Sequence, residues 1–455
     1  MNLSTQLEFM LKLVQSYTIG FQLNSIYNSI YYTALHDLYN TTDSDVTTLK
    51  SLEIFYNQWL EHCDKELDRE LKSSIFTSLL STYLNLLVEL RSILRKNGYP
   101  VYYFSWLFDS IVRNVMVFAS IEKDFHLSQF DVMFIKGKTR VLHYHKGVKN
   151  SYADASKDEK IEHPLLLIYA PINRFHIMDI SKDRSVVQRL ISNGLDIYLL
   201  DWGYPGWEDS NLSLNDYVNY VKDAVEDIKQ KSESDKVSIF GYCWGGIIAL
   251  IYAALNNESV QSLTLMATPV DFSKDNTILA NWLKVMDSDR IVDEFGHVDG
   301  QVLDMGFLMR NPPRYAFDKY LNLFKRSNDK QFVDNFISVE KWLYDTPIVP
   351  GKLYRQIVND CYKYNKLISN ELVIDENIID LKNITAPLLT IVAENDDLVS
   401  PESTLAVREY LSSNDITSLT VPGGHIGLCV STKAHERLWP ETVKWIMSKS
   451  KLRSK

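Results

Sequence analysis

Short apolar runs alternate with longer amphipathic segments through the second half of the chain. The runs that we predict to be strands cover residues 165–169, 195–200, 237–240, 262–266, 388–393 and 416–421. Apolar residues at helical spacing predict helices between them, over residues 182–193, 213–230 and 246–255. Strands that alternate with helices favour an α/β fold, in which a mostly parallel sheet carries helices on both faces.

Three other stretches complete the predicted organisation. Residues 130–135 and 139–144 predict a pair of strands around Gly137, and residues 1–122 predict an N-terminal helical region. That region includes a capping box of Thr5 with Glu8. Residues 272–383 break the strand–helix rhythm and predict a largely helical cap. We therefore expect a core in two parts, residues 123–271 and 384–455, with the cap inserted between them.

Net charge and cysteine spacing indicate what the chain is not expected to bind and where it is expected to occur. The chain has 455 residues, too many for one compact core, and a formal net charge of −10 at pH 7. An acidic chain without a basic patch is not expected to bind nucleic acid. Its four cysteines show no paired spacing, so we predict neither disulfides nor a metal site and expect a cytoplasmic protein.

Residues 13–35 carry no charge, but polar side chains interrupt them. Burying those groups in lipid is costly, so we predict no transmembrane segment.

The strongest chemical signal is the segment Gly241-Tyr242-Cys243-Trp244-Gly245-Gly246, which follows a predicted strand and precedes a predicted helix. This is the nucleophile-elbow pattern with cysteine in place of serine, and it indicates an α/β-hydrolase fold. The glycines suit a tight turn with closely packed backbone. The backbone N–H of Trp244 is then directed toward an oxyanion. The other cysteines, Cys63, Cys361 and Cys429, fit the ordinary role of small buried apolar residues.

A cysteine nucleophile needs a base and an orienting carboxylate, which follow it along the chain in that fold as acid and then histidine. Asp396 follows the strand that ends at Ala393, and His425 follows the strand that ends near Val421. The loops at the carboxyl ends of parallel strands gather at one edge of the sheet. We therefore predict a triad of Cys243, Asp396 and His425. Asp397 competes with Asp396 for the acid role.

The choice of cysteine also points to a kind of reaction. A thiolate that attacks a thioester exchanges one thioester for another, with little change in bond energy. The acyl group stays activated for transfer to an alcohol, and a serine ester would lose that driving force. The chemistry favours acyl transfer from a thioester over simple hydrolysis.

Several ordered motifs over residues 125–447 resemble the catalytic subunit of a class III polyhydroxyalkanoate (PHA) synthase. They are the cysteine elbow and the segments 169–174, 201–205, 268–272 and 423–427, together with Asp179, Lys341, Trp342 and Asp345. The resemblance implies polymerisation of 3-hydroxyacyl-CoA, with short chains such as 3-hydroxybutyryl favoured, into polyester with release of CoA. No cofactor is implied.

The resemblance also implies roles for single residues. Cys243 would carry the acyl chain, and His425 with Asp396 would activate the thiol and the incoming hydroxyl. A backbone N–H at Ile172 or Asn173 would give the second oxyanion donor. Asn173 and Asp179 stand at family-like positions, although ordinary loop and helix-start hydrogen bonding explains both equally well.

Two features depart from the family pattern. Asp397 stands where the family usually has histidine, and a second carboxylate there is expected to alter the pKa of His425. Residues 1 to about 120 have no counterpart in the shorter class III subunits, which work with a separate helical partner of the PhaE kind. We expect a homodimer or hetero-oligomer located at the surface of polyester granules. The extension is a candidate to replace, dock or strengthen that partner, to touch the polymer granule through its aromatic, uncharged first helix, or to form a dimer or folding domain.

Two other functions stay open. A cysteine hydrolase related to dienelactone hydrolases, or a thioesterase, would use the same triad, but dienelactone hydrolases are smaller and have no long cap. A granule-associated scaffold with an inactive site would not need the complete triad.

Overall fold

The computed structural model describes residues 128–144, 164–311 and 329–450, with five single residues between 311 and 329. The N-terminal helical region, the capping box at Thr5, the uncharged stretch 13–35 and Cys63 all lie outside the described residues. Residues 123–310 and 341–455 form one compact unit, and the rest of the chain belongs to a second one. The predicted domain boundaries stay predictions.

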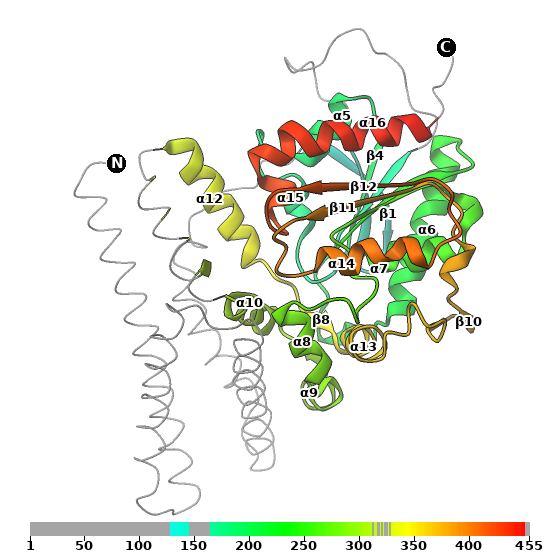
Figure 1. Ribbon diagram of the computed structural model, residues 1–455, viewed down its shortest axis with the longest axis vertical. Helices are drawn as coiled ribbons and strands as arrows, with labels where there is room; N and C mark the ends of the chain where they lie inside the picture. Colours follow the sequence, from blue (N-terminus) through cyan, green and yellow to red (C-terminus); the bar gives the residue numbers. More distant parts are fainter. Residues whose placement is uncertain are drawn as a thin grey trace, which may run out of the picture. The chain divides into compact units, whose positions relative to one another are not determined.

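An eight-stranded sheet is the centre of the first unit (Figure 1). Its strand order is β1-β2-β4-β3-β5-β6-β11-β12. The pairs β1–β2 and β2–β4 are antiparallel, and all the others are parallel. The strands are β1 (Phe130–Lys136), β2 (Thr139–Tyr144), β3 (Leu165–Ile168), β4 (Ile197–Asp201), β5 (Val237–Tyr242), β6 (Val260–Met266), β11 (Leu388–Ala393) and β12 (Ile416–Val421).

Helices cover both faces of this sheet. On one face α5 (Val186–Ser192) packs against α16 (Trp439–Lys449), and on the other α6 (Leu214–Ser232) packs against α7 (Trp244–Leu255) (Figure 1). The short helix α14 (Pro401–Leu405) contacts β11, and α15 (Gly427–Val430) follows β12. This is the α/β-hydrolase architecture that the sequence predicted.

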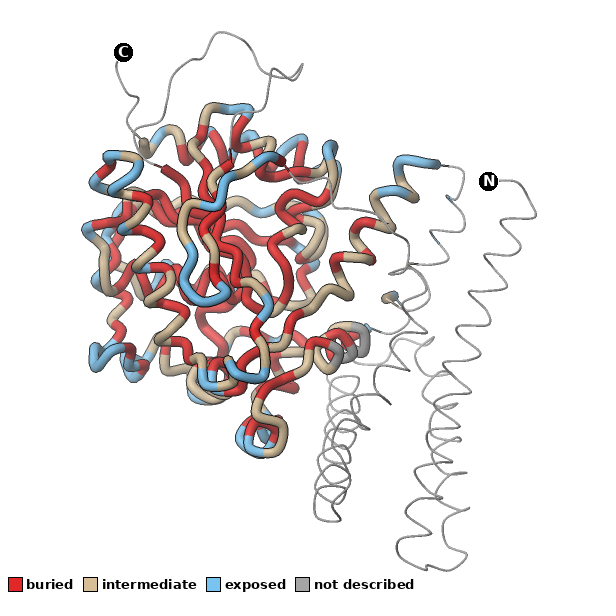
Figure 2. Tube along the Cα trace, turned by 180° about the vertical axis from the view of Figure 1, so that it is seen from behind, coloured by how far each residue is buried: buried red, intermediate tan, exposed pale blue. Residues whose placement is uncertain are grey.

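The middle strands are buried on both faces, as parallel strands between two helical layers must be. Every residue of β3, β4, β5 and β11 is buried (Figure 2). Their continuous apolar sequences therefore carried the strand signal correctly, to within two residues at each end. Helix α5 is shorter than the predicted 182–193, because Ser185 caps it by accepting a hydrogen bond from the backbone N–H of Gln188 at 2.8 Å.

The described residues between β6 and β11 are mostly helical, and among them are four very short strands in two antiparallel pairs, β7–β8 and β9–β10. Its elements are α8 (Ile278–Val285), α9 (Ser288–Phe295), β7 (His297–Val298), α10 (Gly300–Met309), α12 (Lys330–Leu343), β8 (Val349–Pro350), α13 (Gly351–Gln356), β9 (Val373–Ile374) and β10 (Asn377–Ile378). A π-helical turn, Ile357–Lys363, continues α13. We call residues 272–383 the cap.

Candidate active site

Cys243 occupies the turn between β5 and α7. Its φ is +56° and its ψ is −129°, a backbone conformation that non-glycine residues rarely adopt. The turn is held on the β6 side, where the backbone N–H of Cys243 donates to the Met266 carbonyl at 3.0 Å, and it is closed by a bond from the Gly246 N–H to the Cys243 carbonyl at 2.9 Å. A strained residue in a strand-to-helix turn is the backbone geometry of a nucleophile elbow, and the nucleophile role of Cys243 stays a prediction.

The glycines of the elbow are required by close backbone contacts. A Cβ added at Gly241 would lie 2.5 Å from the Cα of Gly246. One added at Gly245 would overlap the Ile168 carbonyl at the end of β3, and one at Gly246 would overlap the side chain of Thr268. The elbow is therefore packed directly against the ends of its neighbouring strands, and no larger residue fits at these three positions.

Asp396 and His425 lie in the loops that follow β11 and β12, and the structure brings them together. His425 Nδ1 and Asp396 Oδ2 are 2.8 Å apart, and both residues are buried. The other carboxylate oxygen of Asp396 accepts backbone N–H groups from Leu398 at 2.9 Å and from Val399 at 3.0 Å. These bonds fix the carboxylate, so Asp396 orients the imidazole with Nδ1 carrying a proton and Nε2 turned away from the acid.

Both predicted partners of His425, Asp396 and Cys243, affect the pKa of its imidazole. Burial by itself would lower the pKa of the imidazole, but the negative charges of Asp396 and of the ionised Cys243, with hydrogen bonds to both, raise the pKa of His425 above its ordinary value. The protonated ring is therefore favoured when the thiol is ionised. This arrangement suits a histidine that takes the thiol proton and later returns it.

The two predicted oxyanion residues lie on adjoining segments. Trp244 is the first residue of α7, where backbone N–H groups have no partner within the helix. Ile172 belongs to the loop that follows β3, and that loop begins beside Gly245, where an added Cβ would overlap the carbonyls of Ile168 and Tyr169. We call residues 169–174 the β3 loop.

Two of the three supporting residues, Asn173 and Asp179, hold backbone segments in place. The Asn173 side chain accepts the backbone N–H of Arg174 at 2.6 Å and so shapes the β3 loop. Asp179 is fully buried, and its carboxylate accepts bonds from Ser128 and Ser185 at the start of α5. This is the helix-start role that the sequence left open for Asp179.

Asp397 is turned toward the cap. Its carboxylate forms an ion pair with Arg310, the residue that follows α10. The charges that chiefly raise the pKa of His425 are those of Asp396 and Cys243. Asp397, where the sequence departs from the family pattern, thus connects the loop after β11 with the cap.

Sequence reasoning missed two tyrosines that hold this site. The Tyr242 hydroxyl donates to the His425 carbonyl at 2.8 Å, and the Tyr242 ring stacks on the imidazole with centroids 5.0 Å apart. The indole N–H of Trp244 donates to the hydroxyl of Tyr362, in the cap, at 3.1 Å. Tyr242 stands next to the nucleophile, which was the one available signal, whereas nothing local marks Tyr362.

Other features of the described residues offer no competing site. Cys361 and Cys429 are fully buried, and burial raises the pKa of both thiols well above its usual value. Within the described ranges, no three His, Cys, Asp or Glu side chains gather as a metal site. None of the described helices is long and apolar enough to cross a membrane.

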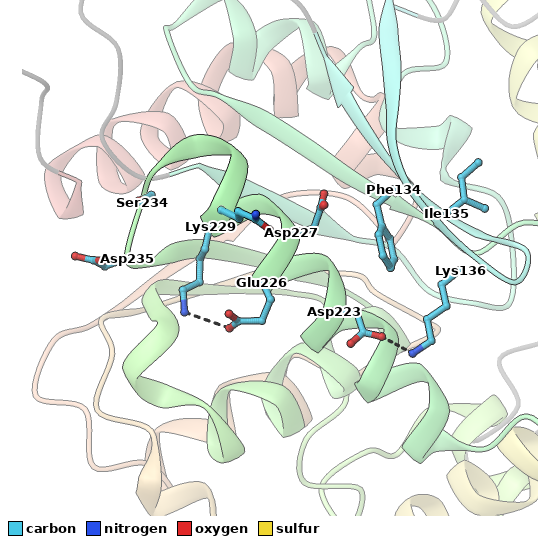
Figure 3. A pocket seen from close by; sticks show the side chains of 10 residues that line it. Phe134, Ile135, Lys136, Asp223, Glu226, Asp227, Lys229, Ser234 and Asp235 are labelled. Atoms are coloured by element: carbon cyan, nitrogen blue, oxygen red, sulfur yellow. Dashed lines mark hydrogen bonds and ion pairs between the residues drawn. The ribbon is translucent and has the colours of Figure 1, made fainter.

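A groove lies between β1 and α6 (Figure 3). It is lined by charged side chains that pair with one another, such as Lys136 with Asp223 and Lys229 with Glu226. None of the predicted site residues lines it. The groove is therefore not part of the candidate active site.

The fold and the cysteine elbow together define an α/β-hydrolase-fold protein. A family model described as the alpha/beta hydrolase fold matches residues 177–431. The PhaC subunit of the poly(3-hydroxyalkanoate) polymerase of Allochromatium vinosum is 39% identical over 284 residues, which cover 62% of this chain and 80% of the relative. The corresponding subunit of Synechocystis is 39% identical over 291 residues, or 62% of this chain and 77% of the relative.

The chain therefore belongs to the family of PhaC subunits of poly(3-hydroxyalkanoate) polymerases, as its motifs indicated. The PhaC subunit of Haloferax mediterranei is 37% identical over 323 residues, 70% of this chain, and the match spans 64% of that relative's length.

Proposed function

We propose that this protein polymerises 3-hydroxyacyl-CoA into polyester and releases CoA, with Cys243 as the nucleophile. The observation that carries the proposal is the strained cysteine elbow in a chain of the PhaC family, with a buried Asp396–His425 pair in the loops that follow β11 and β12. The reaction needs no cofactor, because the thioester of the substrate already activates the acyl group.

In the first half of the cycle, His425 takes the proton of the Cys243 thiol, and the thiolate attacks the thioester carbonyl. Backbone N–H groups of Trp244 and of the β3 loop, at Ile172 or Asn173, stabilise the oxyanion that forms. The carbon–sulfur bond to CoA then breaks, and the CoA sulfur takes the proton from His425. The acyl group is now a thioester of Cys243. Asp396 holds the imidazole and stabilises its charged form throughout.

In the second half, the hydroxyl of another acyl unit or of the growing chain attacks the Cys243 thioester. His425 removes the hydroxyl proton as the new ester bond forms. The Cys243 sulfur leaves as a thiolate and regains its proton from His425. One ester bond is formed and one CoA thiol is released per cycle, so protons and electrons balance without a further reactant.

The setting of the reaction is also part of this proposal. We expect short acyl groups such as 3-hydroxybutyryl, a cytoplasmic protein at the surface of polyester granules, and a homodimer or a complex with a separate helical subunit. The classification with PhaC subunits, which are named as parts of a polymerase, supports a multi-subunit enzyme.

The first prediction is that the purified chain releases CoA from 3-hydroxybutyryl-CoA and forms insoluble polymer, and that Cys243→Ala abolishes both. Free thiol and precipitated polyester are measured in parallel. Cys361→Ala is the matched control, because it removes a buried thiol with a raised pKa that has no role in the cycle. Its CoA release should stay within about threefold of wild type, as expected for a substitution outside the machinery.

Other outcomes separate the rival functions. Free 3-hydroxybutyrate without polymer would identify a thioesterase or hydrolase. A chain that stays inactive even with a separate helical subunit of the PhaE kind would contradict the polymerase and favour a scaffold. Activity that appears only when that subunit is added would show a two-subunit enzyme.

A further inference from the structure

A buried tryptophan of the cap reaches the loop that follows β3. Trp342 lies near the end of α12, and only 3% of its surface is exposed. Its indole N–H donates to the backbone carbonyl of Arg174 at 2.6 Å, across 168 residues of sequence. Arg174 is the last residue of the β3 loop, and this loop supplies the second oxyanion donor of the proposed cycle.

The side chain of Arg174 is bound to the core of the fold. One guanidinium nitrogen lies 3.1 Å from the carboxylate of Asp201, at the end of β4, and another donates to the Gly203 carbonyl. The residue is almost fully buried. Its carbonyl is thus a fixed point at which core and cap meet.

The β3 loop is held by an indole N–H at each end. Trp202 donates to the Tyr169 carbonyl at 2.7 Å from the core side, and Trp342 donates to the Arg174 carbonyl from the cap side. Between these anchors, Asn173 accepts the backbone N–H of Arg174. The direction of the loop's N–H groups therefore depends on both anchors, and only one of them belongs to the cap.

A second contact ties the same part of the cap to Arg174. The guanidinium carbon of Arg174 lies 4.0 Å from the centre of the Tyr204 ring. The Tyr204 hydroxyl in turn donates to the Asp345 carboxylate and lies 2.9 Å from Oδ1 and 3.0 Å from Oδ2. Asp345 follows Trp342 by three residues. Residues 342–345 therefore hold Arg174 by its carbonyl and, through Tyr204, by its side chain.

An oxyanion donor acts only when it is aimed at the position that the charge will occupy, and small displacements cost much of its effect. We propose that Trp342 is a positioning residue, through which the cap aligns the β3 loop for oxyanion stabilisation. The inference rests on the proposed function and deepens it. It predicts that loss of the indole N–H slows the chemical steps and leaves the binding of acyl-CoA unchanged.

The test is Trp342→Phe, which keeps an aromatic ring in the buried space and removes the donor. We expect kcat for CoA release from 3-hydroxybutyryl-CoA to fall by about 10- to 100-fold, somewhat less than the loss of a whole oxyanion donor. The KM should stay within about twofold, because the bond acts mainly on the transition state.

Trp445→Phe is the matched control. Trp445 lies in α16, is buried to a similar extent, and donates its indole N–H to Thr417 Oγ1 at 3.1 Å, at the start of β12. The variant Trp445→Phe also loses one indole hydrogen bond, so a general loss of packing would appear in both variants. We expect its kcat to stay within about twofold of wild type, the range of a change outside the site.

Two analogues distinguish alignment from folding. The unreactive thioether S-(3-hydroxybutyl)-CoA reports binding of the ground state, and 3-hydroxybutanal adds to the thiol to give an oxygen at the oxyanion position. Trp342→Phe should bind the thioether as wild type does and should bind the aldehyde more weakly, by the same factor as its loss of kcat.

Three results would overturn the inference. They are a kcat for Trp342→Phe within about twofold of wild type, a loss of thioether binding that matches the loss of rate, and an equal loss in Trp445→Phe. Failure of the proposed function is a separate result, since it requires an inactive wild-type chain.

Discussion

At the scale of single residues, the site depends on a few groups held in unusual states. Cys243 has a positive φ because β5 ends and α7 begins within one turn, and the glycines around it have no room for a side chain. His425 is buried yet has a raised pKa, because the negative charges of Asp396 and of the ionised Cys243 lie beside it. These states persist only because surrounding backbone bonds hold each group in place.

A prediction for Asp396 follows from the sign of this pKa shift. A histidine whose pKa is raised by folding adds stability that is fully present below about pH 6.5 and is lost as the pH rises through the folded value. Asp396→Asn removes the largest charge that raises the pKa of His425. We expect the difference in free energy of unfolding between wild type and variant to shrink as pH rises above 6.5, measured by urea unfolding at a series of pH values.

Asp397→Asn is the control for that experiment. Asp397 is the neighbouring residue, but it pairs with Arg310. It should leave the pH profile between pH 6.5 and 10 unchanged and should cost far less activity than Asp396→Asn, for which we expect a loss of about 10²- to 10⁴-fold. Equal effects of the two substitutions would show that the acid was wrongly assigned.

The sequence predicted the turn at Cys243 and the pairing of Asp396 with His425, which the structure contains, whereas the catalytic roles of these residues stay predictions. The elbow, the acid and the histidine were predicted because glycines mark the turn and because loops at the carboxyl ends of parallel strands gather. The bonds of Tyr242 to His425 and of Trp244 to Tyr362 span 183 and 118 residues. Such contacts depend on the path of the chain through the core and cap, which local patterns do not contain.

At the scale of elements, the sheet and the cap differ in how strongly the sequence determines them. Strands β11 and β12 were predicted residue for residue, because a continuous apolar run or a regular alternation marks each. The cap was predicted as helical but not as an ordered set of elements. Its two-residue strands have no periodic signal, and its helices contain buried polar groups such as Asp304 in α10.

The cap contains a buried acid that gives a testable pH dependence. Burial, and to a lesser extent the charges of Asp299 and Asp345, raise the pKa of Asp304 to about 7, although Thr346 donates a hydrogen bond to it at 2.6 Å. The folded state therefore retains this proton up to higher pH than the unfolded state, so stability falls as pH rises from about 4 to 7. Asp304→Asn removes that loss and keeps an acceptor for Thr346.

We expect Asp304→Asn to be more stable than wild type at pH 8, by at most about 4 kcal/mol, and nearly equal to it at pH 4. Thermal unfolding followed at the two pH values measures this. The exposed residue Asp235 provides the control, and Asp235→Asn should match wild type at both pH values. A variant that is less stable than wild type at pH 8 would show that the carboxylate itself is needed by the cap.

At the scale of the whole molecule, the candidate site belongs to one compact unit. The bonds of Cys243, Asp396 and His425, and the anchors of the β3 loop, all join residues within 123–310 and 341–455. The match to the Allochromatium relative covers 62% of this chain, so the PhaC-like part leaves a large remainder. The role of residues 1–122 stays a prediction, and we expect it to be separable from the chemistry.

The last prediction tests that separation. A chain of residues 123–455 keeps every contact named for the site, so we expect it to unfold cooperatively and to release CoA from 3-hydroxybutyryl-CoA in a reaction that Cys243→Ala abolishes. If residues 1–122 replace a helical partner, this shorter chain should make less polymer for each CoA released at first, and addition of the separate 1–122 segment should restore it. An unfolded or wholly inactive shorter chain, beside an active full chain, would show that the site needs residues 1–122 in order to form.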